Sequence, residues 1–195
     1  MGHAEDVSAG AGPRPMRADA RRNYERILAV ARQAFLEHGA AASLDDVARQ
    51  AGVGAGTLYR HFPNRSALLD VVYREYAQEL GDQAMALAAA EPPFEALAQW
   101  MRCLAVSMAQ NQGLKEATVA ENLDLNACRE IYTVAGEKLL DAARDAGTIR
   151  DGVELPDIFK FVHAATLGTE NSGDPAGQID RLLPVIFDGL RCPAP

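Results

Sequence analysis

The chain has 195 residues, of which 48% are hydrophobic and 24% are charged, a composition typical of a folded chain rather than a disordered one. Its longest apolar run, Ala84–Ala90, falls far short of the ~20 residues that a membrane-spanning helix needs, and no apolar run follows Met1, so we expect a cytoplasmic protein with no membrane partner. The net charge of -8 is uneven: nine arginines and five acidic residues give +4 from Arg14 to Arg65, whereas ten basic and twenty acidic residues give -10 from Ser66 onward. A basic N-terminal third on an acidic body is typical of a localised module that binds anions.

The first 17 residues are predicted to form a disordered tail, because they hold glycine, alanine, serine and prolines with almost no large apolar side chain. Helical spacing of apolar residues then begins at Tyr24, continues to Phe35 and stops at Gly39. We expect one amphipathic helix over this basic segment.

Two short helices follow, separated by a turn that contains glycine. Ser43 to Asp46 has the pattern of a capping box, and the helix behind it is expected over residues 44–51. After the turn at 52–54, the next helix is expected over 55–62, with Leu58 and Phe62 pointing inward. A longer helix followed by two short ones around a glycine turn predicts a helix-turn-helix motif.

The rest of the chain predicts further helices, and no alternating segment is long enough for a strand. Asn64 is expected to cap a long helix that ends near Ala90, before a Glu-Pro-Pro break. Apolar stripes mark two helices over 97–108 and 125–139, and Glu121 and Asn126 are interpreted as capping residues. Two final helices follow, the last of which should be kinked or divided by Pro184. The predicted fold class is all-α, with a three-helix domain over 18–65 and a helical domain over 66–195.

The second short helix leaves an outward face that suits the major groove of DNA. Small residues at its start, Ala55 and Gly56, let the backbone approach base edges, while the polar side chains behind them can donate to phosphates or bases. These side chains are Thr57, Tyr59, Arg60 and His61. Arg65 is expected to clamp a phosphate beside a positive helix end, and Arg21 and Arg22 add charge on the first helix.

The run from Arg26-Ile-Leu-Ala to Leu69, and above all Gly56-Thr-Leu-Tyr-Arg-His-Phe62, resembles the DNA-binding domain of the tetracycline-repressor (TetR) family of bacterial regulators. The resemblance implies that phosphates are held by Thr57, Tyr59, His61 and Arg65, and that the residues nearest the bases are Ala55, Gly56 and Arg60. Many members carry serine and lysine where this chain has Gly54 and Ala55. Base readout would therefore rest more heavily on Arg60 or on the arginines near the first helix, namely Arg17, Arg21 and Arg22.

The same resemblance implies that the second domain binds a ligand and forms a homodimer through the last two helices. The expected function is a transcriptional repressor that binds a palindromic operator in double-stranded DNA and leaves it when a small apolar or aromatic effector binds. Candidate pocket residues are the aromatic and adaptable side chains of the middle helices, together with a histidine on the penultimate helix. They are Tyr76, Phe94, Trp100, Met101, Leu104, Met108, Tyr132 and His163. Core packing is the alternative role for each of them.

Other classes of protein find less support in the sequence. Neither a G-x-S-x-G nor an H-E-x-x-H motif is present, so we expect no catalysis. The widely spaced Cys103, Cys128 and Cys192 suggest buried thiols rather than disulfides or a zinc site, and we expect no metal and no cofactor. An α-helical adaptor that binds a protein partner is harder to distinguish by periodicity, but it gives the cluster of Arg60, His61 and Arg65 no role.

Overall fold

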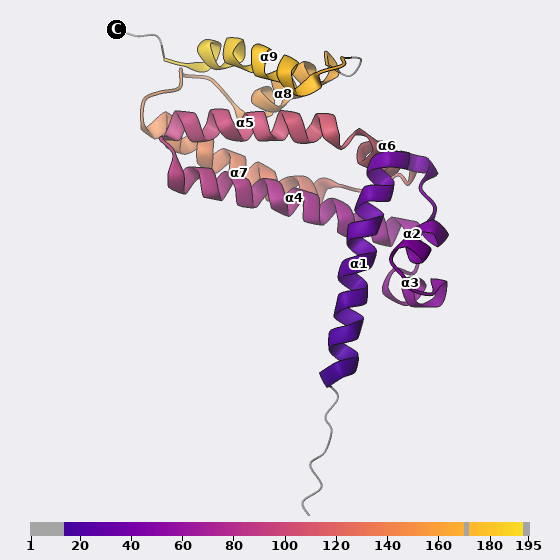
Figure 1. Cartoon of the computed structure of the whole chain (residues 1–195). Helices are drawn as coiled ribbons and strands as arrows, with labels where there is room; N and C mark the ends of the chain where they lie inside the picture. Colours follow the sequence, from indigo (N-terminus) through magenta and orange to yellow (C-terminus); the bar gives the residue numbers. More distant parts are fainter. Residues whose placement is uncertain (1–13, 170–171, 193–195) are drawn as a thin grey trace, which may run out of the picture.

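The structure is a computed structural model that describes residues 14–169 and 172–192. Within these ranges it is built from helices, with one isolated bridge between Ile149 and Arg191, which confirms the all-α class. The helices in chain order are α1 (Arg14–His38), the 3-10 helix η1 (Gly39–Ala41), α2 (Leu44–Gln50), α3 (Ala55–His61), α4 (Arg65–Ala90), α5 (Pro93–Gln110), α6 (Gln112–Ala120), α7 (Asn126–Asp145), α8 (Leu155–Leu167) and α9 (Pro175–Leu190) (Figure 1). The expected tail falls mostly on residues 1–13, which lie outside the described residues, whereas residues 14–17 belong to α1.

Helices α1, α2 and α3 form the N-terminal unit, which we call the head. The Ser43 hydroxyl accepts a hydrogen bond from the backbone N–H of Asp46 (3.3 Å), as expected for a cap of α2. Gly52 has φ +66°, a backbone conformation that glycine adopts without strain, and this turn redirects the chain from α2 into α3. Leu58 and Phe62 are buried as predicted, and Phe62 stacks on Tyr24 of α1, so the outer face of α3 is left to polar and small residues.

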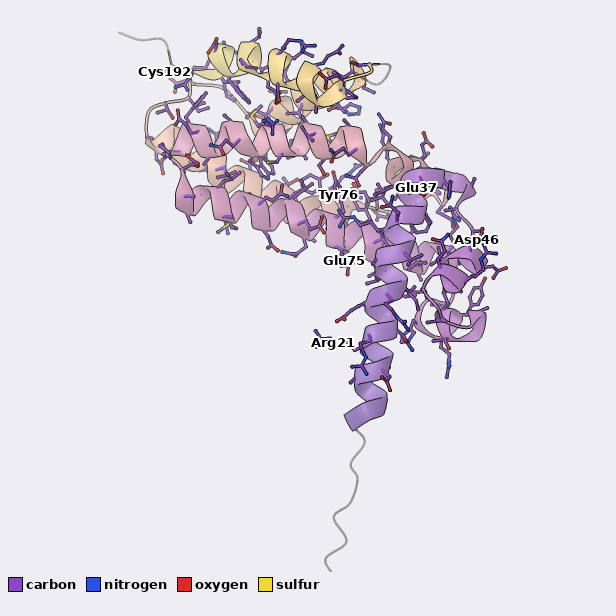
Figure 2. All side chains as sticks on the ribbon, viewed as in Figure 1. Arg21, Glu37, Asp46, Glu75, Tyr76 and Cys192 are labelled. Carbon is purple, nitrogen blue, oxygen red and sulfur yellow. The ribbon has the colours of Figure 1, made fainter. Side chains whose placement is uncertain are left out.

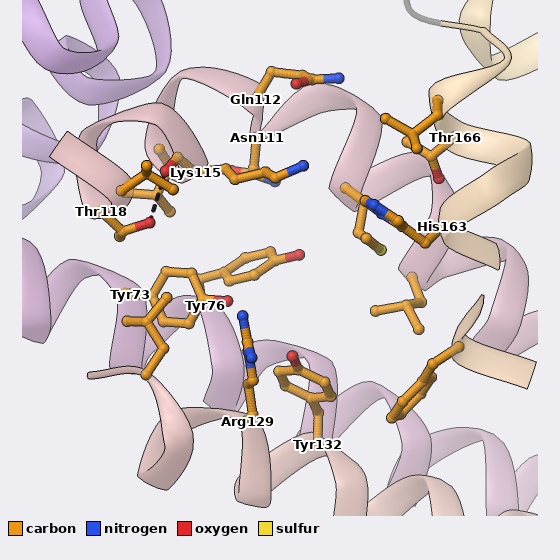
Figure 3. A pocket seen from close by; sticks show the side chains of 17 residues that line it. Tyr73, Tyr76, Asn111, Gln112, Lys115, Thr118, Arg129, Tyr132, His163 and Thr166 are labelled. Carbon is orange, nitrogen blue, oxygen red and sulfur yellow. Dashed lines mark hydrogen bonds between the residues drawn. The ribbon is translucent and has the colours of Figure 1, made fainter. Parts of the chain in front are cut away.

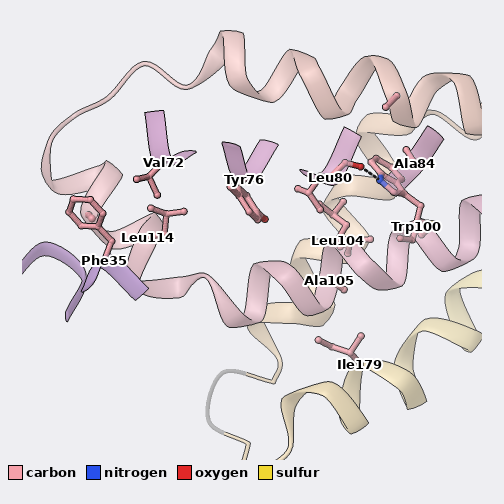
Figure 4. Close-up of a cluster of buried hydrophobic side chains, with 14 of the residues drawn as sticks. Phe35, Val72, Tyr76, Leu80, Ala84, Trp100, Leu104, Ala105, Leu114 and Ile179 are labelled. Atoms are coloured by element: carbon pink, nitrogen blue, oxygen red, sulfur yellow. Dashed lines mark hydrogen bonds between the residues drawn. The ribbon is translucent and has the colours of Figure 1, made fainter. Parts of the chain in front are cut away.

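Helix α4 connects the head to the rest of the molecule, which we call the body. The Asn64 side chain caps it by accepting from the N–H of Ala67 (2.8 Å), as the sequence predicts. The N-terminal part of α4 packs on α1, while the remainder runs alongside α5 and α7 (Figure 1). In the body core the indole N–H of the buried Trp100 donates to the carbonyl of Leu80 (2.9 Å), which joins α5 to α4 (Figure 4).

Three details differ from the sequence-based expectation. Helix α6 was not predicted, since its nine residues bury only Leu114, Ala117 and Thr118 and show no long apolar stripe. Of the two outcomes expected at Pro184, a kink or a division, division does not occur, because α9 continues through this residue. Among the cysteines, Cys128 is buried as expected, but Cys103 is half-buried and Cys192 is exposed. Within the described ranges no helix is long and apolar enough to span a bilayer.

Candidate nucleic-acid interface and internal pocket

The outer face of α3 is open to solvent along its whole length. Ala55, Gly56, Tyr59 and Arg60 are exposed, and a Cβ atom added to Gly56 would meet no other atom within 4 Å. Gly54 occupies the N-cap position of α3 and offers no side chain for capping, as the sequence indicated. The start of α3 therefore presents backbone rather than bulky side chains to an incoming partner.

Arg60 is the principal cation on this face, and it rests along its own helix. Its Nε donates to the carbonyl of Gly56 (3.2 Å) and its Nη2 donates to the hydroxyl of Thr57 (3.1 Å). Both bonds are made at an exposed site, where water competes for the donors and a hydrogen bond contributes little net free energy. The guanidinium can therefore exchange these contacts for a base edge or a phosphate.

His61 has a second role, because its ring holds α3 against α1. The imidazole and the Tyr24 ring meet edge to face with centroids 5.8 Å apart, and Tyr24 stacks on Phe62 at 5.2 Å. Since His61 is half-buried, part of the imidazole still reaches the surface beside Arg60. The aromatic contacts fix the position of α3 in the head.

Arg21 and Arg22 lie on the part of α1 that extends away from the body (Figure 2 labels Arg21). Their side chains are 81% and 65% exposed, and they pair with Glu25 and Asp19 on the same helix. Exposed pairs of this kind are worth little, so an external phosphate competes with them easily. Both arginines remain available for the role expected from the sequence.

Arg65, which was expected to clamp a phosphate, contacts groups of the protein itself in this structure. Its guanidinium donates to the carbonyls of Gly39 and Ala40 (both 3.0 Å) and of Ala42, and it lies over the Phe35 ring at 5.0 Å. It also pairs with Glu121 of the body (3.2 Å). The side chain is 20% exposed and its donors are directed to groups of the protein; its expected contact with a phosphate stays a prediction.

Glu121 and α6 complete a joint between head and body. Glu121 was interpreted as a helix cap, but one of its carboxylate oxygens forms the ion pair with Arg65 and the other accepts a hydrogen bond from the Ser66 hydroxyl (2.6 Å). On α6, a Cβ added to Gly113 would lie 2.5 Å from the carbonyl oxygens of Phe35 and Leu36. Only glycine permits this approach, so the backbone of α6 lies directly on the end of α1.

A cavity of about 420 Å³ lies in the body between helices α4, α5, α6, α7 and α8 (Figure 3). Five of the eight candidate pocket residues line it, namely Tyr76, Leu104, Met108, Tyr132 and His163. This volume falls in the range of pockets that bind small molecules. The structure therefore brings these five together at one site.

The other three candidates, Phe94, Trp100 and Met101, belong to the core and not to the pocket. Trp100 and Met101 are fully buried, and the indole packs so closely on Gly136 that a Cβ there would lie 2.5 Å from it. Phe94 is covered by the Arg191 guanidinium, 3.8 Å from the ring centroid. Their apolar stripe correctly indicates an inward face, but neighbouring atoms already fill the space in front of it.

Most of the polar residues that line the pocket were not predicted from the sequence. These residues are Tyr73, Asn111, Gln112, Lys115, Thr118, Arg129 and Thr166. The i, i+3 spacing of Arg129 and Tyr132, which places both on one face of α7, is a signal that was available. Residues on α6 could not be found in this way because that helix was not predicted. Among the described residues, no three His, Cys, Asp or Glu side chains gather as they would around a metal ion.

The tyrosine hydroxyls of the pocket are weak acids. Burial raises the pKa of Tyr76 to about 12, although a hydrogen bond with Ser107 acts in the opposite direction. Burial also raises the pKa of Tyr132. The pKa of Tyr73 is raised by burial too, against the opposing effects of Arg129 and of hydrogen bonds with Tyr132 and Arg129. At neutral pH all three phenols keep their protons and can donate hydrogen bonds.

A helix-turn-helix head with an open recognition face, joined to a helical body with an internal pocket, defines the class of helix-turn-helix transcriptional regulators. The family described as bacterial regulatory proteins, tetR family, matches residues 27–72, and the family described as transcriptional regulator SbtR-like, C-terminal domain, matches residues 92–192. The chain belongs to the TetR family of transcriptional regulators.

Solved structures of family members resemble this chain over nearly their whole length. A TetR transcriptional regulator from Streptomyces coelicolor is 38% identical, with a TM-score of 0.72 over 87% of this chain and 99% of the other. A TetR regulator from Mycobacterium vanbaalenii is also 38% identical, with a TM-score of 0.71 over 91% and 100%. An HTH-type transcriptional regulator of Staphylococcus aureus (strain USA300) is 44% identical over 54 residues, which are 27% of this chain and only 29% of that relative.

Proposed function

We propose that the protein is a homodimeric repressor that binds a palindromic operator through α3 and leaves it when a small molecule enters the pocket. The position of α6 carries this proposal. One side of α6 lines the pocket with Gln112, Lys115 and Thr118, and Gly113 lies against the backbone of α1. An occupant that displaces α6 therefore also displaces the head.

Helix α4 offers a second connection between pocket and head. It begins at Arg65 in the joint and reaches the pocket at Tyr73 and Tyr76, about two and three turns later. A ligand releases DNA only if it binds the DNA-incompetent arrangement more tightly than the competent one. A difference of about 1–3 kcal/mol, the usual size of such coupling, is sufficient for a response.

The outer faces of α8 and α9 support the proposed dimer. Phe161 and Leu167 on α8 are 53% and 46% exposed, and Leu182 and Val185 on α9 are 43% and 72% exposed. These helices form the outermost layer of the body, away from the head (Figure 1). Exposed apolar side chains at this density are typical of interfaces, and a two-fold dimer suits two DNA half-sites about 34 Å apart.

The pocket supports the small-molecule effector. A structure with the same fold, the transcriptional regulator FadR from Bacillus subtilis, was solved in complex with stearoyl-CoA; it is 19% identical, with a TM-score of 0.61 over 86% of this chain and 99% of that one. That likeness concerns the fold alone. Which ligand fits this chain has to follow from its own pocket residues.

Selection of purified protein on random duplex DNA at two salt concentrations tests the proposal, together with sedimentation analysis of the oligomeric state. We expect an inverted repeat to be recovered and a dimer to bind it, with weaker retention at the higher salt. Val185→Glu, which places a charge on the proposed interface, should weaken dimerization and operator binding together, whereas Val134→Glu on the exposed surface of α7 serves as the control. Recovery of no motif at either salt, or binding by a monomer, would contradict the proposal.

A further inference from the structure

The pocket has a charge opposite to that of the domain around it. Its lining includes two cationic side chains, Arg129 and Lys115, and no aspartate or glutamate. From Ser66 onward the chain carries twenty acidic residues against ten basic ones. Within the described part of the chain neither cation forms an ion pair, whereas Arg74 on α4 and Arg144 at the far end of α7 each pair with an aspartate. Both pocket cations belong to exposed residues, so water solvates them and an anionic ligand can take its place.

The Arg129 guanidinium points into the pocket, towards the hydroxyl ends of the tyrosines (Figure 3). It and Tyr132 both engage the Tyr73 hydroxyl. A guanidinium has five N–H donors, and one phenolic oxygen satisfies only a part of them. The residue is also accessible to solvent, so a ligand can reach the donors that remain.

Beside these polar residues, the pocket has an apolar wall. It is formed by Leu104, Met108, Leu114, Val119, Leu125, Phe159 and Leu167. A purely hydrocarbon ligand would displace water from the guanidinium and offer no hydrogen-bond acceptor in its place, which costs free energy. A cationic ligand would be repelled. A small molecule with an apolar part and one anionic group satisfies both kinds of wall.

We propose that the pocket binds a small organic carboxylate, with the carboxylate on Arg129 and the apolar part against the side chains of α5 and α8. The planar guanidinium matches a carboxylate with two parallel hydrogen bonds, and the neutral tyrosine hydroxyls supply further donors. Lys115 on α6 adds a second positive charge. Such a ligand is an amphipathic acid, whereas the sequence led us to expect an apolar or aromatic effector, and its role as an effector rests on the proposed function.

Binding to the full-length protein, measured by calorimetry without DNA, tests this assignment. The probes are 3-phenylpropionate, indole-3-acetate and octanoate, each paired with its primary amide, together with 3-phenylpropylamine and phenyl phosphate. At least one carboxylate should bind, and its amide should bind about 10- to 100-fold more weakly, the range expected when a hydrogen bond to a charged group is lost.

Two variants test whether the preference for a carboxylate over its amide depends on Arg129. Arg129→Gln should lower the affinity of the bound carboxylate to that of its amide and leave the affinity of the amide unchanged. Lys138→Gln makes the same charge change at an exposed position of α7 outside the pocket and should have no effect. Because the amide is measured on the same variant protein, a general loss of folding would lower both affinities and is distinguished from loss of the anion contact.

Four results would overturn the assignment: no carboxylate of the panel binds, the amides bind equally well, the amine or the phosphate ester binds more tightly, or Arg129→Gln preserves the preference. Release of operator DNA is measured separately. A carboxylate that binds through Arg129 but leaves DNA bound supports the ligand class and contradicts the proposed release. If an operator is recovered but no carboxylate binds, the result supports the proposed DNA binding and contradicts the proposed ligand class.

Discussion

The head and the body use arginine in different ways. On the head, Arg21 and Arg22 are highly exposed and each has an acidic partner on its own helix. In the body pocket, Arg129 has no ion pair among the described residues and lies among phenols. Exposed paired cations give several weak and interchangeable contacts, which suits a polymer with repeating phosphates. One oriented, uncompensated guanidinium suits a single anion in a fixed position.

The guanidinium of Arg65, which lies at the joint between head and body, is used in a third way. Its donors are directed to carbonyl oxygens that follow α1, and it forms an ion pair with Glu121. The side chain is the same at the three sites, and the difference lies in its partners and, for Arg65, in its burial. The chemical type of a residue therefore says little about its role until its surroundings are known.

The largest expected effect tests this structural role of Arg65. Arg65→Ala removes the donors of three carbonyl groups and leaves Glu121 without its partner, so we expect a loss of about 2–4 kcal/mol in the free energy of unfolding, measured by urea denaturation. Arg74→Ala, whose exposed pair with Asp70 lies further along α4, is the control and should change stability by less than about 0.5 kcal/mol. Unchanged stability combined with weaker DNA binding would restore the phosphate role that the sequence suggested.

A smaller effect is expected for Arg60, the cation on the recognition face. Arg60→Ala should cost about 1–3 kcal/mol on the preferred operator and less on other sequences, because a base contact carries sequence information. Competition binding with the selected operator and single-base variants measures the difference. Arg49→Ala, an exposed arginine of α2 paired with Asp46, provides a comparison on the same domain. An equal loss on every sequence would show that Arg60 contacts phosphate instead.

The smallest effect is expected on α1. Arg21→Gln and Arg22→Gln should each reduce the slope of log affinity against log salt concentration by about 1, with no change in sequence preference. The folded protein should keep its stability, since each variant loses only an exposed pair. A slope that matches the unsubstituted protein would place these arginines outside the interface.

Much of the head was predictable because its signals are local. The caps at Ser43 and Asn64 and the turn at Gly52 all act within a few residues, so the sequence alone places the helices they bound. The role of Arg65 was not predictable, because the carbonyl groups it binds come from residues more than twenty positions earlier. No local pattern records that approach.

In the body, periodicity alone does not distinguish residues that line the pocket from residues of the packed core. Trp100 and Tyr132 both lie on apolar helical stripes, and periodicity correctly assigns both to an inward face. Whether an inward side chain meets packed atoms or a cavity depends on what the other helices place opposite it. Gly136 of α7 lies against Trp100, whereas Tyr132 faces Tyr73 and open space. Five of the eight candidates were found in this way. Arg129 could have been found from its i, i+3 spacing to Tyr132, whereas Lys115 lies on α6, which was not predicted.

The joint around Arg65 also affects how such regulators can be recombined. Head and body meet there through a small set of matched contacts: Arg65 and Ser66 with Glu121, and the glycine at position 113 with the end of α1. A chimera that takes its head from another regulator keeps its inducer response only if these positions are transferred as a set. Exchange of the exposed residues of α3 alone leaves the joint untouched, and is the simpler route to a sensor that reads a new operator.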